Sequence, residues 1–351
     1  MQYRTFGRRT GLRVSELALG TGNFGTRWGH GAEPAEAKRM FDRYAEAGGN
    51  FIDSADIYQF GEAETLVGEF IAADRDHFVV ATKYSMGATP EAGISRTGNG
   101  RRNMLLAVED SLRRLKTDRI DLLWVHAADG LTPTEEIVRG LDDLVRAGKI
   151  VHAGLSNFPA WRVARADAMA ELRGWAPLVG IQVEYSLAER GAERELLPMA
   201  EALGLGATLW SPLGGGLLTG KYRKGEEGGR LAALGKLVRT EQSERVTAVV
   251  DAVLAVAEEA RSTPTHVAIA WLRARAAASA TALVPILGPR SAAQLEATLG
   301  ALTLQLQADQ LARLEAASAF EAGAPYDQIA SSLAGTRGGH ADIVAPRVPV
   351  A

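Results

Sequence analysis

Short apolar runs alternate along the chain with longer segments of mixed apolar and polar residues. The runs HFVVATK at 77–83 and IDLLWVH at 120–126 show no regular polar alternation, which is typical of strands buried on both faces. The segments between such runs place apolar residues three and four positions apart, as Val108, Leu112 and Leu115 do, which indicates helices that pack on one side. The pattern therefore predicts a parallel sheet covered by helices.

About eight strand–helix repeats follow one another without a linker or a shift in composition. A hairpin is expected over 2–14, and strands are expected over 16–20, 50–53, 77–83, 120–126, 150–156, 180–183, 208–210 and 281–286. Helices are expected over 34–48, 62–72, 100–115, 133–148, 159–173, 190–203, 243–260, 264–277, 291–301 and 308–318. The run TPTE at 132–135 predicts a capping box at the start of one of these helices, with Pro133 at its first position.

Eight such units fit a closed (β/α)8 barrel, the TIM barrel, better than an open sheet. The expected fold is therefore α/β, with one barrel-type domain over 1–351. An N-terminal β-hairpin precedes a barrel core over about 14–318, and a C-terminal extension over about 319–351 shows little periodicity. The Gly-rich stretch from Pro212 to about Gly235 is irregular and long enough to be a functional loop.

Composition narrows the class of protein. Apolar residues make up 46% of the chain and charged residues 23%, which are ordinary values for a soluble protein with a sizeable core. The net charge of −3 favours neither nucleic acid nor a membrane surface as a partner. The chain has no cysteine, which excludes disulfides and thiolate catalysis, and it shows no signal-peptide pattern or membrane-spanning run. We expect a cytoplasmic protein, monomeric or homo-oligomeric.

Four ionisable residues follow the expected strands. Asp53, Lys83 and His126 each end a strand, and Tyr58 lies in the loop after the first of them. Each alone is more often structural than catalytic. Lys83 ends a hydrophobic run, so burying it without a carboxylate partner would be costly, and Asp53 is the natural candidate. Because catalytic groups of a barrel sit at the carboxyl ends of its strands, the four together predict an active site.

These residue types suit the protonation of an oxygen. A phenol ordinarily releases its proton only near pH 10, roughly three units above neutrality. An ammonium group beside Tyr58 favours the phenolate, and Asp53 would hold that ammonium group, Lys83, in place. His126 would orient a substrate carbonyl by hydrogen bonding. Carbonyl reduction fits such a site if a hydride donor is bound.

Two other motifs carry less weight. Residues 20–25, GTGNFG, match the dinucleotide-binding pattern G-x-G-x-x-G, but that mechanism requires the last glycine to open a helix. Here a loop containing Arg27, Trp28 and His30 follows, so a turn that approaches a ligand closely is the favoured interpretation. No H-x-H pair occurs, and no metal site is predicted.

Several longer motifs now establish a resemblance. NFIDSADIYQFG at 50–61, GLSN at 154–157, IQVEYS at 181–186, WSPLGGGLLTGKY at 210–222 and PILGPRSAAQLE at 285–296 occur in order. Together with ATK and the histidine after IDLLWV, they resemble the aldo-keto reductase superfamily, from the hairpin to about residue 318. The stretches SLRRLKTDRIDLLWVH and WSPLGGGLLTGKY are similar to its aryl-alcohol-dehydrogenase-like and potassium-channel-β-subunit-like branches.

This resemblance implies an NADP-dependent barrel enzyme that reduces aldehydes or ketones to alcohols reversibly. NADP(H) would lie across the carboxyl ends of the strands, and NAD(H) is the less favoured cofactor. Tyr58 would act as general acid in reduction and base in oxidation, within a tetrad completed by Asp53, Lys83 and His126. Cofactor contacts are implied for Thr21, Gly22, Asp53, Ser156, Asn157, Gln182, Trp210, Ser211, Leu213, Gly215, Lys221, Gly288, Arg290 and Gln294.

Within that set, the resemblance implies that Trp210 stacks on the nicotinamide ring and that Arg290 pairs with a 2′-phosphate. Arg290 is otherwise a solvated charge at a helix entry. Ala297 and Thr298 replace residues that often contact the adenine in relatives.

Two further questions stay open at this stage. A cofactor-binding regulatory subunit is the competing function, and an isomerase or lyase on the same barrel is disfavoured by Trp210. Several aromatic residues either line a substrate pocket or belong to the core. They are Phe24, Trp28, Phe60, Tyr84 and Trp124.

Overall fold

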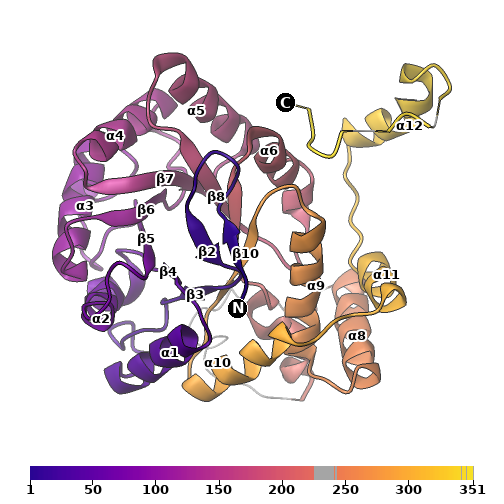
Figure 1. Ribbon diagram of the computed structural model, residues 1–351, viewed down its shortest axis with the longest axis horizontal. Helices are drawn as coiled ribbons and strands as arrows, with labels where there is room; N and C mark the ends of the chain where they lie inside the picture. Colours follow the sequence, from indigo (N-terminus) through magenta and orange to yellow (C-terminus); the bar gives the residue numbers. More distant parts are fainter. Residues whose placement is uncertain (225–240, 242, 341, 345, 351) are drawn as a thin grey trace.

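Eight parallel strands close into a barrel, as Figure 1 shows. The computed structural model describes residues 1–224, 241, 243–340, 342–344 and 346–350. The barrel strands are β3 (Ala18–Gly20), β4 (Phe51–Asp53), β5 (Val79–Tyr84), β6 (Ile120–Val125), β7 (Ile150–Ser156), β8 (Leu178–Glu184), β9 (Gly206–Trp210) and β10 (Leu283–Leu287). They pair in chain order, and β10 closes the barrel against β3. The predicted (β/α)8 fold is confirmed.

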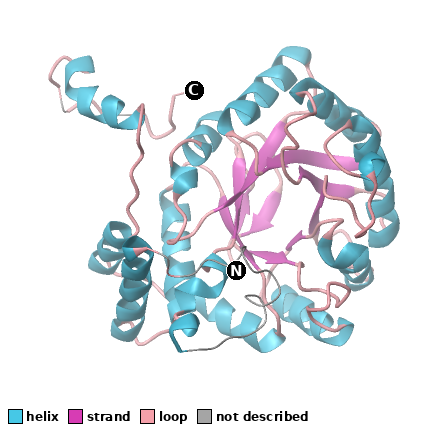
Figure 2. Cartoon of the chain, turned by 180° about the vertical axis from the view of Figure 1, so that it is seen from behind, coloured by secondary structure: helices cyan, strands magenta, loops and turns pink. Residues whose placement is uncertain are grey.

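Helices surround the barrel on its outside (Figure 2). They are α1 (Pro34–Glu46), α2 (Glu62–Phe70), α3 (Arg101–Leu115), α4 (Thr134–Arg146), α5 (Ala160–Arg173), α6 (Leu196–Leu203), α8 (Glu244–Glu259), α9 (Pro264–Ala278), α10 (Ala292–Leu299) and α11 (Ala308–Ala317). In α4 the residues Ile137, Leu141 and Leu144 recur every three or four positions and are almost fully buried. This spacing places one apolar stripe against the barrel.

The N-terminal hairpin pairs β1 (Tyr3–Thr5) with β2 (Arg13–Ser15) and closes one end of the barrel interior. Between its strands, the Phe6 ring lies 5.7 Å from Phe51 and 6.2 Å from Trp124, measured between ring centroids. A Cβ atom at Gly180 would come within 2.5 Å of the Phe6 ring, so glycine is required for this close approach. The closed end leaves the carboxyl ends of the strands as the mouth of the barrel.

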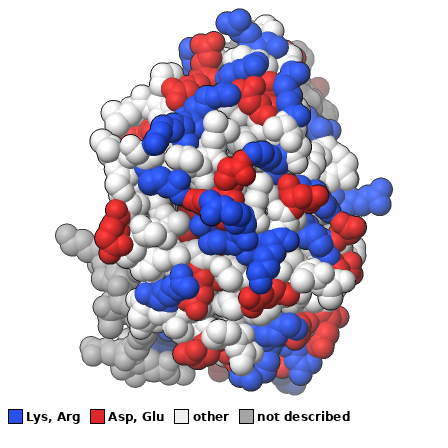
Figure 3. Space-filling view, turned by 90° about the vertical axis from the view of Figure 1, so that its left-hand side faces the viewer, with Lys and Arg blue, Asp and Glu red and all other residues white. Residues whose placement is uncertain are grey.

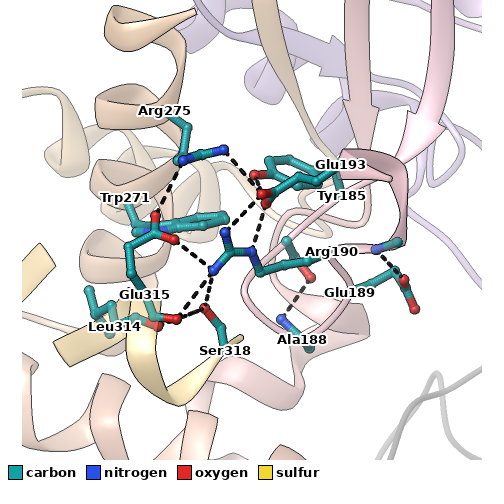
Figure 4. Close-up of polar contacts among 12 residues, drawn as sticks. Tyr185, Ala188, Glu189, Arg190, Glu193, Trp271, Arg275, Leu314, Glu315 and Ser318 are labelled. Carbon is teal, nitrogen blue, oxygen red and sulfur yellow. Dashed lines mark hydrogen bonds and ion pairs between the residues drawn. The ribbon is translucent and has the colours of Figure 1, made fainter. Parts of the chain in front are cut away.

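An ionic network around the buried Arg190 ties the loop after β8 to α9 and α11 (Figure 4). The guanidinium of Arg190 is bound by Glu193 at 2.6 Å and by Glu315 at 2.6 Å, and it lies 5.5 Å from the centroid of the Trp271 ring. Arg275 adds a second cation, 3.2 Å from Glu193. Cations and carboxylates alternate here, so each buried charge has an opposite partner, which a buried charge needs.

The surface carries both signs of charge. The face in Figure 3 intersperses basic and acidic side chains, with no field of one sign. Many are paired, as Arg101 is with Asp143 and Lys38 with Asp42. Among the described helices, none is long and apolar enough to cross a membrane.

The C-terminal extension differs from its prediction, because residues 326–336 form a helix, α12 (Tyr326–Thr336). This helix projects from the barrel in Figure 1, and none of its residues is buried. A hydrogen bond from the Tyr326 hydroxyl to Glu195 at 2.6 Å connects it to the barrel. The sequence did not predict this helix because its large aliphatic residues, Ile329 and Leu333, are only two and lie among small residues.

Two helix starts also differ from the sequence predictions. The capping box is wrong: α4 begins at Thr134, Pro133 is its N-cap, and the Thr132 hydroxyl donates to Asp129 at 2.6 Å instead. Asp129 also accepts from the Thr132 backbone N–H, so both groups of Thr132 are bound to Asp129 and its hydroxyl does not cap the helix. The helix expected over 190–203 is α6, from Leu196, preceded by a 3-10 turn over Gly191–Glu193.

The Gly-rich stretch after Pro212 contains two 3-10 helices, η4 (Gly214–Thr219) and η5 (Lys221–Lys224). The rest of the predicted irregular loop, 225–235, lies outside the described residues.

Candidate active site

Four side chains from three neighbouring strands meet at the mouth of the barrel. Asp53 ends β4, Lys83 lies in β5, His126 follows β6, and Tyr58 opens the 3-10 turn η1 (Tyr58–Gly61). The Lys83 ammonium donates to the Asp53 carboxylate at 2.6 Å, to the Ser54 carbonyl at 2.7 Å and to the Tyr58 hydroxyl at 3.1 Å. The structure therefore brings the four predicted site residues together.

Lys83 is fully buried and remains charged. Burial alone would lower its pKa, but the Asp53 carboxylate, aided by Tyr58, outweighs burial and raises the pKa of Lys83. Asp53 is itself 2% exposed, and its second oxygen accepts from the Gln182 amide at 2.8 Å. With both oxygens bound, Asp53 is an anchor for Lys83 and is not placed to act as a base.

His126 faces Tyr58 across the mouth, with 6.1 Å between ring centroids. Burial, with the Lys83 ammonium as a second cause, lowers the pKa of His126 to about 3. The imidazole is therefore neutral at physiological pH. Its Nδ1 is buried and has no hydrogen-bond partner within the described chain. A neutral ring beside a half-buried phenol can orient a polar ligand atom without adding a charge.

Gln59 holds the Tyr58 turn in an unusual backbone conformation, and the sequence reasoning missed it. Gln59 has φ 49° and Phe60 has φ 52°, in the left-handed region that such residues rarely adopt. The Gln59 side chain, fully buried, accepts from the backbone of Trp28 at 2.8 Å and donates to the carbonyls of His30 at 3.0 Å and Gly22 at 3.2 Å. These bonds compensate the strain and fix the 22–30 loop beside Tyr58.

Four of the predicted cofactor contacts, Ser156, Asn157, Gln182 and Trp210, lie at or near the carboxyl ends of β7, β8 and β9. The Asn157 amide donates to the His126 carbonyl at 3.0 Å, and its oxygen accepts from the Trp210 indole N–H at 3.1 Å. Ser156 and Gln182 are buried next to it, while Asn157 is exposed and Trp210 is half-buried. Asn157 therefore links the His126 backbone to the Trp210 indole and fixes the orientation of that ring.

The other predicted contacts lie on loops around this mouth. Ser211, Leu213, Gly215 and Lys221 follow β9, on the segment that contains η4 and η5. Thr21 and Gly22 follow β3, and a Cβ atom at Gly22 would lie 3.9 Å from the Tyr58 ring. Gly288 and Arg290 lie between β10 and α10, and Gln294 lies in the first turn of α10, where its side chain accepts from the Arg290 backbone N–H at 2.9 Å.

Asn23, to which the sequence analysis gave no role, joins two of these loops. The Asn23 amide donates to the carbonyl of Pro289 at 3.0 Å and to that of Gly288 at 3.2 Å. A sequence offers no local signal for a contact between residues 266 positions apart.

The five aromatic residues divide into core and mouth. Phe24, Tyr84 and Trp124 are buried in the core, which decides the alternative left open for them. Trp28 instead lies edge-on to Tyr58 at 6.1 Å and to Phe60 at 6.2 Å between ring centroids. Trp28 thus borders the phenol, and Phe60 packs against Trp28.

A family model described as the Aldo/keto reductase family matches residues 16–319. The chain belongs to the aldo/keto reductase family. The resemblance read from the motifs is thereby confirmed, and the match ends just before the C-terminal segment that carries α12.

Relatives of this aldo/keto reductase are named as reductases and dehydrogenases. It is 34% identical over 335 residues to norsolorinic acid reductase of Aspergillus flavus, covering 93% of this chain and 83% of that protein. It is 37% identical over 323 residues to the uncharacterized oxidoreductase YrpG of Bacillus subtilis, covering 90% and 95%. It is 34% identical over 345 residues to aryl-alcohol dehydrogenase [NADP(+)] of Phanerodontia chrysosporium, covering 93% and 88%. These names support an oxidoreductase activity.

Proposed function

We propose that this protein is an NADPH-dependent reductase of aldehydes or ketones, acting reversibly, with Tyr58 as its general acid. The observation that carries the proposal is the Lys83 ammonium, which is bound at once to Asp53 and to the Tyr58 hydroxyl. A buried cation at 3.1 Å stabilises the negative charge left on the phenol after it gives up its proton.

The residues support a defined proton path. A bound nicotinamide cofactor supplies the hydride. As the carbonyl carbon accepts that electron pair, the π pair moves to the carbonyl oxygen, and the Tyr58 hydroxyl donates its proton there. Lys83 then stabilises the phenolate, and neutral His126 holds the substrate oxygen by hydrogen bonding. In oxidation the Tyr58 phenolate takes the proton of the alcohol.

The mouth of the barrel fits a nicotinamide cofactor. Asn157 holds the N–H of the Trp210 indole, and Trp210 is half-buried, so part of its side chain is accessible for stacking. Gly214, Gly215 and Gly216 all have positive φ, so the chain after β9 carries no side chain at the successive turns that would approach a pyrophosphate. Ser156, Asn157 and Gln182 supply hydroxyl and amide groups of the kind that hold a carboxamide.

The preference for NADP over NAD rests on Arg290. Its side chain is exposed just before α10, where the helix N-terminus also favours an anion. Arg290 would hold the 2′-phosphate, with Gln294 and Gly288 near the adenosine. The relative from Phanerodontia chrysosporium is named as using NADP(+).

The substrates proposed are aromatic or otherwise bulky carbonyl compounds. The Trp28 ring borders the Tyr58 phenol and is backed by Phe60, so an apolar surface lies beside the carbonyl that Tyr58 would protonate. Two of the relatives are named as norsolorinic acid reductase and aryl-alcohol dehydrogenase.

The test replaces the proposed acid and keeps the ring. Tyr58→Phe should lower kcat for NADPH-linked reduction of a nitrobenzaldehyde by about 10²–10⁴-fold, the usual contribution of a general acid. NADPH binding, followed by quenching of tryptophan fluorescence, should be nearly unchanged. Tyr84→Phe is the matched control, because the Tyr84 hydroxyl is buried and donates to the Asn99 carbonyl, away from Lys83. Undiminished turnover in Tyr58→Phe would remove Tyr58 from this role.

A further inference from the structure

Asp56 is a buried carboxyl group beside the tetrad, and the proposed proton path does not use it. It lies two residues before Tyr58, is 2% exposed, and its backbone N–H donates to the Lys83 carbonyl at 3.0 Å. Its Oδ1 is buried without a hydrogen-bond partner in the described part of the chain. An ionised carboxylate left in this way is costly, so the environment favours the neutral acid.

The surrounding charges already balance without Asp56. Glu64 of α2 is fully buried; it accepts from the Arg114 guanidinium at 2.6 Å and from the Thr82 hydroxyl at 2.5 Å. The other cation, Lys83, is bound to Asp53. The charges that act on Asp56 are Glu64 on α2, Arg114 on α3 and Lys83 on β5, and Asp56 in turn acts on Tyr84 on β5. Asp53 and Tyr58 are the titratable groups nearest to Asp56 along its own segment.

Lys83 and Arg114 are thus paired with Asp53 and Glu64, and Asp56 has no cation as a direct partner among the described residues. Burial, followed by the charge of Glu64, raises the pKa of Asp56 to about 7, against the opposing pull of Arg114, the Ile57 backbone N–H and Lys83. Burial likewise raises the pKa of Tyr84 well above its ordinary value, so that phenol stays neutral. Among these neighbours, Asp56 is thus placed to change charge near neutral pH.

We propose that Asp56 is a positioning residue that is protonated in the most active form of the enzyme, and that losing its proton weakens Tyr58 as an acid. The inference rests on the proposed function of Tyr58. Reduction leaves negative charge on the Tyr58 phenol, which Lys83 stabilises. A second, uncompensated carboxylate whose field reaches Lys83 opposes that charge. Carbonyl reduction should therefore slow as pH rises through neutrality.

Asp56→Asn tests this directly, because the amide has nearly the same shape and cannot ionise. Wild-type kcat should fall by about twofold to fivefold between about pH 6 and about pH 8, the effect over this range of a group titrating near pH 7 that weakens Tyr58 by up to one pKa unit. The ratio of Asp56→Asn to wild-type kcat should rise by the same factor over this range. A merely structural role would change kcat at every pH alike.

Glu64→Gln provides a second, independent variant. Removing that carboxylate frees Arg114 to stabilise ionised Asp56, so the fall in kcat should move to lower pH. If Asp56→Asn fails to fold, as judged by circular dichroism, this shift decides the question. A wild-type profile that stays flat from about pH 6 to 8, or an unchanged inflection in either variant, would overturn the proposal.

A measurement without turnover separates this inference from the proposed function. The infrared band of a protonated carboxyl group should be present in the wild type near pH 6, weaken by about pH 8, and be absent in Asp56→Asn. Absence of this band in the wild type would refute a protonated Asp56 even if the enzyme is active. If Tyr58→Phe turns over normally while the band behaves as expected, the role of Tyr58 fails and the protonation of Asp56 stands.

Discussion

Replacing Lys83 by methionine tests the buried ion pair and the chemistry separately. Lys83 and Asp53 are 0% and 2% exposed, and their charged atoms are 2.6 Å apart. In Lys83→Met, Asp53 keeps the Gln182 amide as a hydrogen-bond donor but loses the opposite charge. A carboxylate in that state is buried and uncompensated.

The expected cost follows from this burial. Removing one partner of a buried ion pair typically costs about 3–5 kcal/mol of unfolding free energy, because the other charge is stranded. Neutralising both partners in Lys83→Met/Asp53→Asn should restore most of that loss, since neither group is then charged. The matched control is Lys38→Met: Lys38 also lies 2.6 Å from a carboxylate, that of Asp42, but the two side chains are 48% and 43% exposed. An exposed helix pair of this kind contributes less than about 0.5 kcal/mol.

The assays are urea unfolding and NADPH-linked turnover of each variant. Lys83→Met should lose both stability and turnover, the double variant should regain stability without turnover, and Lys38→Met should lose neither. The reasoning fails if Lys83→Met is no less stable than Lys38→Met. It also fails if the double variant recovers turnover, because Tyr58 would then not need the Lys83 ammonium.

Two further predictions concern the cofactor and pH. Arg290→Ala should raise KM for NADPH about tenfold, the loss of one charged contact to phosphate, and leave KM for NADH within about twofold; equal changes for both cofactors would argue against a 2′-phosphate contact. The pKa of His126 is lowered from 6.5 to about 3, so the neutral ring favours folding above about pH 6.5, and this contribution is lost as pH falls toward 3. His126→Gln should therefore lose less stability than the wild type between about pH 7 and pH 4 in urea unfolding, and an identical loss would contradict a neutral His126.

The alternation of strands and helices was predictable because burial determines the pattern of apolar residues along each element. A strand covered on both faces is apolar throughout, and a helix covered on one side is apolar every three or four residues. The β7 strand has the predicted bounds, 150–156, and most other elements lie within a few residues of theirs. The C-terminal helix α12 was not predicted, because none of its residues is buried and its sequence therefore shows little apolar periodicity.

Helix starts and aromatic residues were less predictable. The TPTE run at 132–135 matches a capping box, but Asp129 competes for the same threonine. Whether Phe24 or Trp28 lies at the mouth depends on the path of the loop between them. The pattern of apolar residues in the sequence does not predict that path. Gln59 bridges to a loop some 30 positions earlier, and its strained φ is maintained by those distant carbonyls.

The sequence by itself determined the repeated strand–helix pattern and placed three ionisable residues at strand ends, because both are encoded in neighbouring residues. Only the tertiary structure decided how those groups are paired. Pairing of β4 with β5 brings Lys83 within hydrogen-bonding distance of both Asp53 and Tyr58, and the packing of α2 and α3 gives Glu64 its own cation. Asp56 is thereby left without one. Its charge state depends on which neighbours are already paired, and that is a property of the folded arrangement rather than of any local stretch of chain.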